Sequence, residues 1–232
     1  MSRLHVLARL LAVTAAAVFI GSTETADAGS VNFCGGAAGW RASWDVSLNS
    51  TVQVIAADCS RLDDGLLFIQ KSAEFTQGPV NGIFPTIPIV FAQTGPTKVQ
   101  QIIIEDEIIT NSTGVAWTDF HFDLLDSGDA VFNPEMSAKS QGGGPIGFSI
   151  APFTTAVFTN GNTRLDIAGG VVPNGEYWFP GDGGKDGQLW IDVMPHMEAP
   201  YTTFILKETP TPEPSTLVLL ALGSLGLLRR RR

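Results

Sequence analysis

The sequence predicts an all-β fold, an antiparallel β-sandwich, for the body of the chain. Apolar and polar residues alternate with a period of two in several segments, and no segment of the body keeps a helical period over three turns. The 232 residues include 25 Gly and 14 Pro, which mark frequent turns. About nine or ten short strands separated by such turns favour a sandwich.

The first expected strand runs from Trp44 to Ala56, where the even positions are mostly apolar and the odd positions mostly polar. Two hairpins are expected. One joins Val99–Thr110 to Val115–Leu124, and the other turns at Asn160-Gly161. Further strands are expected at 66–75, 87–91, 154–159, 162–167, 176–179, 188–194 and 201–207.

Residues 1–28 have the features of a secretory signal peptide. Two arginines precede an apolar run at 10–20, and the segment closes with the small side chains of Ala26 and Ala28, which suit signal peptidase. As a helix, this run is too short to cross a hydrocarbon core about 30 Å thick. We therefore expect export and cleavage rather than a retained anchor.

Residues 210–232 contain three parts in order. The proline-rich stretch 210–216 predicts an extended spacer, so the body is expected to span 29–209. The apolar run 217–228 predicts a short helix in transient contact with the membrane, and the arginines after it would stay on the cytoplasmic side. A fold-closing strand is the alternative, but it would not need four arginines. The residues of this pattern are Pro212, Glu213, Pro214, Arg229, Arg230, Arg231 and Arg232.

This order of parts resembles the PEP-CTERM sorting signal of Gram-negative bacteria. The resemblance covers only the last 23 residues. It implies an exosortase, a membrane-embedded cysteine transpeptidase, as the partner that removes the tail. It also implies delivery to the cell surface or the exopolysaccharide matrix, as in a biofilm.

Two stretches of the body, 104–122 and 169–175, are similar to segments common in proteins that carry this tail. That similarity implies an immunoglobulin-like form of the sandwich. It implies no activity.

The body contains two cysteines, Cys34 and Cys59. Because an exported chain meets an oxidising compartment, we expect a disulfide between them. Two unpaired buried thiols are the alternative.

Candidate catalytic and metal-binding residues are few. His121 lies between Asp119 and Asp123 on one face of an expected strand. These three side chains could form an acid–base or metal cluster, or they could simply be the exposed polar face of the strand. Asp182 and Asp186 resemble part of a calcium loop but lack its alternating ligands and closing glutamate. We expect no cofactor, with calcium as the one candidate ion.

Trp117 shares a strand face with Asp119 and His121, so it is the tryptophan that we single out as a candidate for exposure and binding. An exposed indole could stack on a sugar ring, whereas burial in the core is the alternative.

The body holds eight basic and twenty acidic residues, which argues against nucleic-acid binding. Three functions remain open. The first is an exported, non-catalytic protein of the surface or matrix. The second is a carbohydrate-binding module for matrix glycan, and the third, ranked last, is a polysaccharide hydrolase with paired carboxylates.

Overall fold

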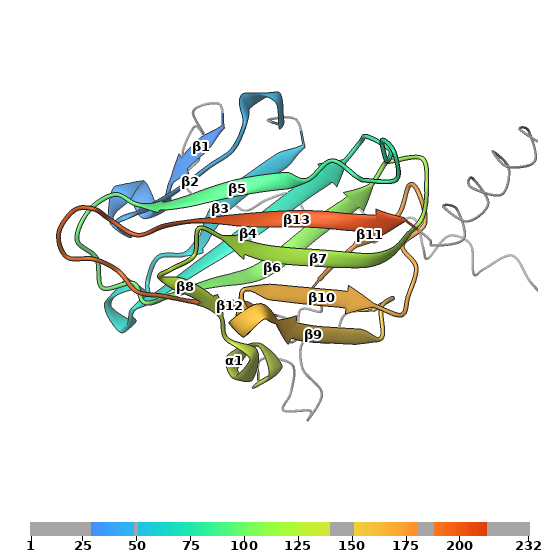
Figure 1. The fold of residues 1–232 in the computed structure, drawn as a ribbon. Coiled ribbons are helices and arrows are strands. Elements are labelled where there is room, and N and C mark those ends of the chain that lie inside the picture. Colours follow the sequence, from blue (N-terminus) through green and yellow to red (C-terminus); the bar gives the residue numbers. More distant parts are fainter. Residues whose placement is uncertain (1–28, 49–50, 140–150, 181–187, 213–232) are drawn as a thin grey trace, which may run out of the picture.

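Two β-sheets pack face to face in the computed structural model (Figure 1), which describes residues 29–48, 51–139, 151–180 and 188–212. The expected signal helix and apolar C-terminal helix lie outside these residues. Within them, no helix is long and apolar enough to cross a membrane.

The larger sheet has seven strands in the order β1-β2-β5-β13-β7-β10-β9, and every neighbouring pair is antiparallel. Its strands are β1 (Ser30–Asn32), β2 (Trp40–Ser43), β5 (Ile87–Gln93), β7 (Trp117–Leu125), β9 (Thr155–Thr159), β10 (Arg164–Ala168) and β13 (Thr203–Pro212).

The second sheet has six strands. Five follow the order β3-β4-β6-β12-β8, and β11 pairs with the far end of β6. Strands β4 and β6 run parallel, the one exception to the antiparallel prediction among the described residues. The strands are β3 (Val52–Asp58), β4 (Leu66–Phe75), β6 (Gln101–Asn111), β8 (Ala130–Phe132), β11 (Tyr177–Trp178) and β12 (Leu189–Val193).

Short helices connect some of the strands. They are η1 (Phe33–Gly36), η2 (Val46–Leu48), η3 (Leu62–Asp64), α1 (Pro134–Lys139) and η4 (Asn160–Asn162). The described residues thus confirm an all-β, sandwich-like fold. They form thirteen strands against the nine or ten expected.

The core lies between the sheets because each strand turns alternate side chains inward. In β4, Leu67, Ile69, Ala73 and Phe75 are buried while their neighbours are partly exposed. The largest fully buried side chains are Trp40, Trp117, Trp178, Phe33, Phe91, Phe120, Phe122, Phe132, Phe204, Leu67 and Ile69.

Two of the predicted elements are wrong. The expected strand from Trp44 to Ala56 is divided, because the Asp45 carboxylate accepts the Ser47 N–H (2.8 Å) and starts the turn of η2. The expected hairpin between 99–110 and 115–124 is instead a crossing between sheets, since β6 lies in one sheet and β7 in the other.

The turn at Asn111 makes this crossing possible. The buried Asn111 amide donates to the carbonyls of Val115 and Val172, each at 2.9 Å, and accepts from the Thr113 hydroxyl (2.7 Å). These bonds satisfy the backbone of a segment that leaves one sheet for the other. The hairpin predicted at Asn160-Gly161, by contrast, is confirmed as β9 and β10.

Candidate functional site

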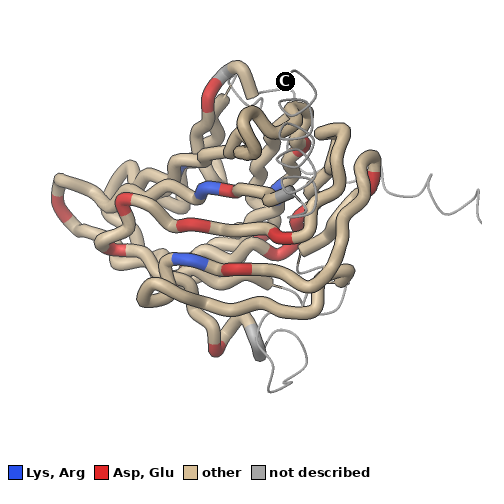
Figure 2. The backbone as a smooth tube through the Cα atoms, turned by 45° about the vertical axis from the view of Figure 1, so that its right-hand side comes forward, with Lys and Arg blue, Asp and Glu red and all other residues tan. Residues whose placement is uncertain are grey.

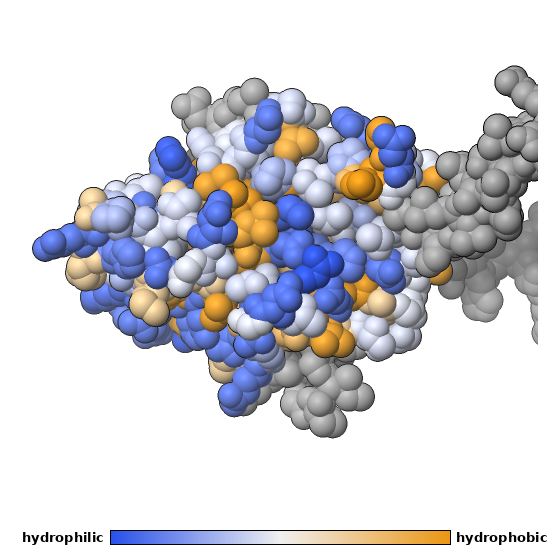
Figure 3. Space-filling model, viewed as in Figure 1, coloured by the Kyte–Doolittle hydropathy of each residue, from blue (hydrophilic) through white to orange (hydrophobic). Residues whose placement is uncertain are grey.

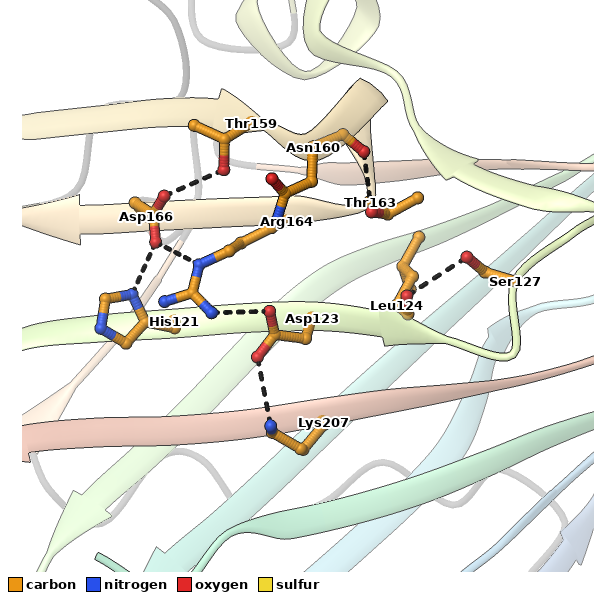
Figure 4. A network of polar contacts seen from close by, with 10 residues as sticks. All are labelled: His121, Asp123, Leu124, Ser127, Thr159, Asn160, Thr163, Arg164, Asp166 and Lys207. Carbon is orange, nitrogen blue, oxygen red and sulfur yellow. Dashed lines mark hydrogen bonds and ion pairs between the residues drawn. The ribbon is translucent and has the colours of Figure 1, made fainter. Parts of the chain in front are cut away.

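A network of charged side chains crosses the outer face of the seven-stranded sheet (Figure 4). His121 and Asp123 project from β7, Arg164 and Asp166 from β10, and Lys207 from β13. They meet because Asp166 lies opposite His121 in the register, and Asp123 lies opposite both Arg164 and Lys207. Figure 3 shows the surrounding face as mostly hydrophilic, with separate apolar patches.

Each member of this network has an ionic partner. Asp166 Oδ1 lies 2.8 Å from His121 Nδ1 and 2.6 Å from Arg164 Nε. Arg164 Nη1 lies 2.9 Å from Asp123 Oδ1, and Lys207 Nζ lies 3.5 Å from the other Asp123 oxygen. The network is therefore a cross-strand ladder of alternating charge.

The ladder lowers the pKa of Asp166. Burial raises the pKa of Asp166, but hydrogen bonds from Arg164 and Thr159 outweigh burial and leave the pKa below its ordinary value. His121 contacts Asp166 of the neighbouring strand. This contact fits the polar strand face that was the alternative to an acid–base or metal cluster. Asp119 lies farther along β7, opposite Thr211.

A second polar cluster, which we term the central triad, lies inside the sandwich. Lys71 of β4 contacts the carboxylates of Glu107 on β6 and Glu208 on β13 through its Nζ. The three side chains are between 0% and 2% exposed. The triad thus joins the two sheets through charged groups in an apolar core.

Strand periodicity explains why these side chains face inward. Lys71 shares the buried row of β4, and Glu208 follows Phe204 and Leu206 in the buried row of β13. In β6 the register slips by one residue at Glu105, since Ile104 pairs with Ile69 and Asp106 with Gln70. This bulge turns Glu107 rather than Asp106 toward the core.

The triad combines one amine with two carboxyl groups, so the single lysine charge cannot balance two ionised carboxylates. Burial raises the pKa of Glu107 to about 8, against the opposing pull of Lys71. Burial alone would lower the pKa of Lys71. The charges and hydrogen bonds of Glu107 and Glu208 have a larger effect, so the pKa of Lys71 is raised above its ordinary value. At neutral pH, Glu107 therefore carries a proton.

We expect the protein to lose stability as the pH rises from about 5 to about 8. Folded Glu107 keeps its proton until about pH 8, whereas an unfolded chain releases it near 4.5. The folded state then binds more protons, so the free energy of unfolding falls by up to about 1.4 kcal/mol per pH unit. Urea unfolding at several pH values measures this slope. The same slope in Glu107→Gln would contradict the assignment.

Trp117, the candidate for exposure, takes the alternative position in the core. Trp117 is fully buried and packs against Phe75 and Phe120, with ring centroids 5.3 and 5.8 Å apart. Its indole N–H points toward the Thr113 hydroxyl at 3.3 Å. An irregularity in β7 accounts for this inward position. Thr211 pairs with Asp119 and Pro212 with Trp117, so Thr118 is an extra residue that reverses the alternation and turns Trp117 inward with Phe120.

An exposed aromatic pair lies elsewhere, at β11. Tyr177 and Phe179 are 62% and 42% exposed, and their rings stack with centroids 6.5 Å apart at an interplanar angle of 28°. The expected strand at Glu176–Phe179 could have predicted this pair. Side chains alternate along a strand, so Tyr177 and Phe179 face outward while Trp178 between them faces the core.

The predicted disulfide is confirmed. Cys34 and Cys59 are bonded, with Cα atoms 5.8 Å apart. The bond ties η1, which lies between two strands of the larger sheet, to the end of β3 in the other sheet.

The calcium and signal-peptide residues, Asp182, Asp186, Ala26 and Ala28, lie outside the described residues. Within the described ranges, no group of three or more His, Cys, Asp or Glu side chains is arranged to hold a metal ion. An open depression of about 710 Å³ lies beside η3, and Asp63, Asp64 and Lys98 are among its lining residues.

The last strand runs farther than the spacer prediction allows. β13 continues to Pro212, with Pro210 opposite Phe120 and Pro212 opposite Trp117 on β7. On its other side, β13 pairs with β5 only as far as Glu208, which lies opposite the first residue of β5, Ile87. The two prolines therefore lie where β13 is paired on one side only, and a missing N–H is tolerated there. The fold therefore extends to Pro212. Glu213, Pro214 and the four arginines lie beyond the described residues.

Residues 210–232 match the PEP-CTERM protein-sorting motif. This match confirms the resemblance and supports export through exosortase sorting, of the Gram-negative type. No curated protein matches the chain. The sorting motif begins within the final strand of the sandwich, which sets it directly against the folded body.

Proposed function

We propose that the protein is an exported, non-catalytic component of the cell surface or exopolysaccharide matrix. The observation that carries the proposal is the sorting motif, which starts inside β13 and continues beyond the fold. The body that the motif delivers is a sandwich closed by a disulfide. The immunoglobulin-like form of that sandwich stays a prediction.

The charge of the body supports an attachment that depends on the tail. Figure 2 shows acidic residues along much of the chain and few basic ones. Such a surface is repelled by the anionic head groups of a membrane and by nucleic acid. We infer that the tail, rather than the charge of the body, brings the protein to the envelope.

We expect the double variant Glu213→Ala with Pro214→Ala to block tail processing. Both residues follow the end of β13, so the sandwich should fold normally. Most of the protein should remain as a longer, membrane-associated precursor in cells that contain an exosortase. Immunoblots of membrane and released fractions measure this. The exposed Glu198→Ala serves as the control, and normal release of the double variant would contradict the proposal.

Carbohydrate binding is a second candidate function, and the pair Tyr177 and Phe179 favours it. Stacked, exposed rings offer an apolar platform on which the C–H faces of a sugar ring can pack. Hydrolysis ranks last, and calcium binding stays a prediction.

If the protein binds glycan, Tyr177→Ala should weaken that binding by about tenfold, equivalent to about 1.4 kcal/mol. A glycan array followed by titration measures the change. Met194→Ala removes a similarly exposed apolar side chain and should leave the affinity unchanged. Equal affinity of the two variants would exclude Tyr177 from a binding site.

A further inference from the structure

The central triad places an amine against two carboxyl groups in a closed space. Lys71 Nζ touches one carboxylate oxygen of Glu107 and one of Glu208. Among the described residues, Lys71 Nζ and both oxygens of Glu208 have no hydrogen-bond partner outside these ion pairs. The amine and the Glu208 carboxyl therefore face each other and Glu107 in the core.

We propose that Lys71 and Glu208 condense into an amide, an intramolecular isopeptide bond, and that Glu107 relays the protons. The bond would link β4 of one sheet to β13 of the other. It is independent of the sorting function proposed above.

The step balances with water as its only other product. Lys71 first passes one proton to the Glu208 carboxylate, which leaves a neutral amine beside a carboxylic acid. The amine lone pair attacks Cδ of Glu208 and forms the C–N bond, while the Glu107 acid protonates the carbonyl oxygen and regains a proton from nitrogen. The C–O bond to one of the two hydroxyls then breaks, and that hydroxyl leaves as water with a proton from Glu107, while Glu107 takes the proton of the remaining hydroxyl as the amide carbonyl forms. Glu107 ends as it began.

The geometry favours this step in two ways. The strands hold the reacting groups in contact, which replaces a bimolecular encounter with an intramolecular one. Burial also penalises charged groups, so it favours the neutral amide over the ion pairs that it replaces.

The roles of the two glutamates follow from the proton. Burial keeps Glu107 protonated, with a pKa of about 8, and Lys71 Nζ contacts Glu107 and Glu208 at once, which holds the two carboxyl groups side by side. A protonated neighbour polarises the carbonyl of Glu208 and supplies the proton that the departing water needs. Glu208 is therefore the group attacked and Glu107 the relay.

The proposed bond would anchor the strand that continues into the sorting motif. β13 ends where Glu213 begins, and the triad lies four residues before that end. A pull on the tail would then pass covalently from β13 to β4.

Peptide mapping of the mature, exported protein tests the proposal without any substitution. Trypsin cannot cut after an amidated Lys71, so we expect a branched peptide that joins residues 62–98 to the peptide beginning at Glu208. Its mass should be lower than the sum of its parts by one water. A branch to the peptide 99–139, which contains Glu107, would contradict the assigned roles. Free Lys71 in all of the protein would overturn the proposal.

Two isosteric variants test the roles. Glu107→Gln should abolish the branched peptide, because it removes the relaying acid. Glu208→Gln should still give the same amide, but with loss of ammonia from the carboxamide instead of water. Circular dichroism and the intact Cys34–Cys59 bond establish that each variant folds. A folded Glu107→Gln protein that forms the branch at the wild-type level would refute the relay.

Discussion

Replacing Lys71 with methionine is expected to lower the free energy of unfolding by about 3 to 5 kcal/mol. Methionine has a similar length but no charge, so it leaves the carboxyls of Glu107 and Glu208 facing each other in an apolar core. The loss is expected with or without the proposed amide, because the variant removes both the ion pairs and the amine. Equilibrium unfolding in urea measures it.

The matched control is Lys98→Met. Lys98 also pairs with a carboxylate, Asp63 at 2.9 Å, but the two side chains are 74% and 93% exposed. Exposed pairs contribute about 0 to 1 kcal/mol, so the control should be nearly neutral. If both variants lost the same amount of stability, the triad would not be the buried electrostatic centre that we describe.

A rescue variant separates charge from packing. Lys71→Met combined with Glu107→Leu and Glu208→Leu removes all three charges and leaves apolar side chains of similar volume. Such replacements of buried ion groups are often neutral or stabilising. We expect the triple variant to recover most of the stability that the single variant loses.

Removing the disulfide through Cys34→Ser with Cys59→Ser is expected to cost about 3 kcal/mol of unfolding free energy. The bond closes a loop with a sequence separation of 25 residues, and the unfolded chain gains entropy once the loop is open. Cys34 also holds a left-handed backbone, with φ of 55°, which serine would have to adopt without the bond.

Urea unfolding of the double variant measures this cost, with the wild type under reductant as the matched comparison. The loss of the bond should also loosen the packing around Phe33, which is buried next to Cys34 and stacks on Phe91 with ring centroids 6.2 Å apart. Faster hydrogen exchange in β1 and β2 should accompany the loss. Unchanged stability and exchange in the double variant would contradict a structural role for the bond.

The long, regularly alternating strands could be predicted from the sequence, whereas the connections between them could not. Leu66–Phe75 has the predicted bounds because it opens on an apolar run and contains no Gly or Pro over its ten residues, and in the fold its side chains alternate in burial. The segment at 111–114 fits a hairpin turn and a crossing between sheets equally well. The choice depends on the distant carbonyl of Val172, to which Asn111 donates, and no local pattern contains that contact.

The central triad shows the same division. Lys71 falls in the buried row of a correctly predicted strand, between Ile69 and Ala73, although the sequence pattern was not used to predict a lysine in the core. Its partner Glu107 could not be assigned to the core, because the bulge at Glu105 reverses the row that faces inward. Trp117 faces the core rather than the side of Asp119 and His121 because the register shift at Thr118 reverses the alternation there.

The C-terminal residue of the mature protein tests the central claim most directly. Mass spectrometry of the protein recovered from the cell surface or medium of an exosortase-containing bacterium would determine it. If the motif at 210–232 directs sorting, the mature chain should end after Pro212 and before the apolar run at 217–228. Recovery of the exported protein with Arg232 still in place would contradict the account.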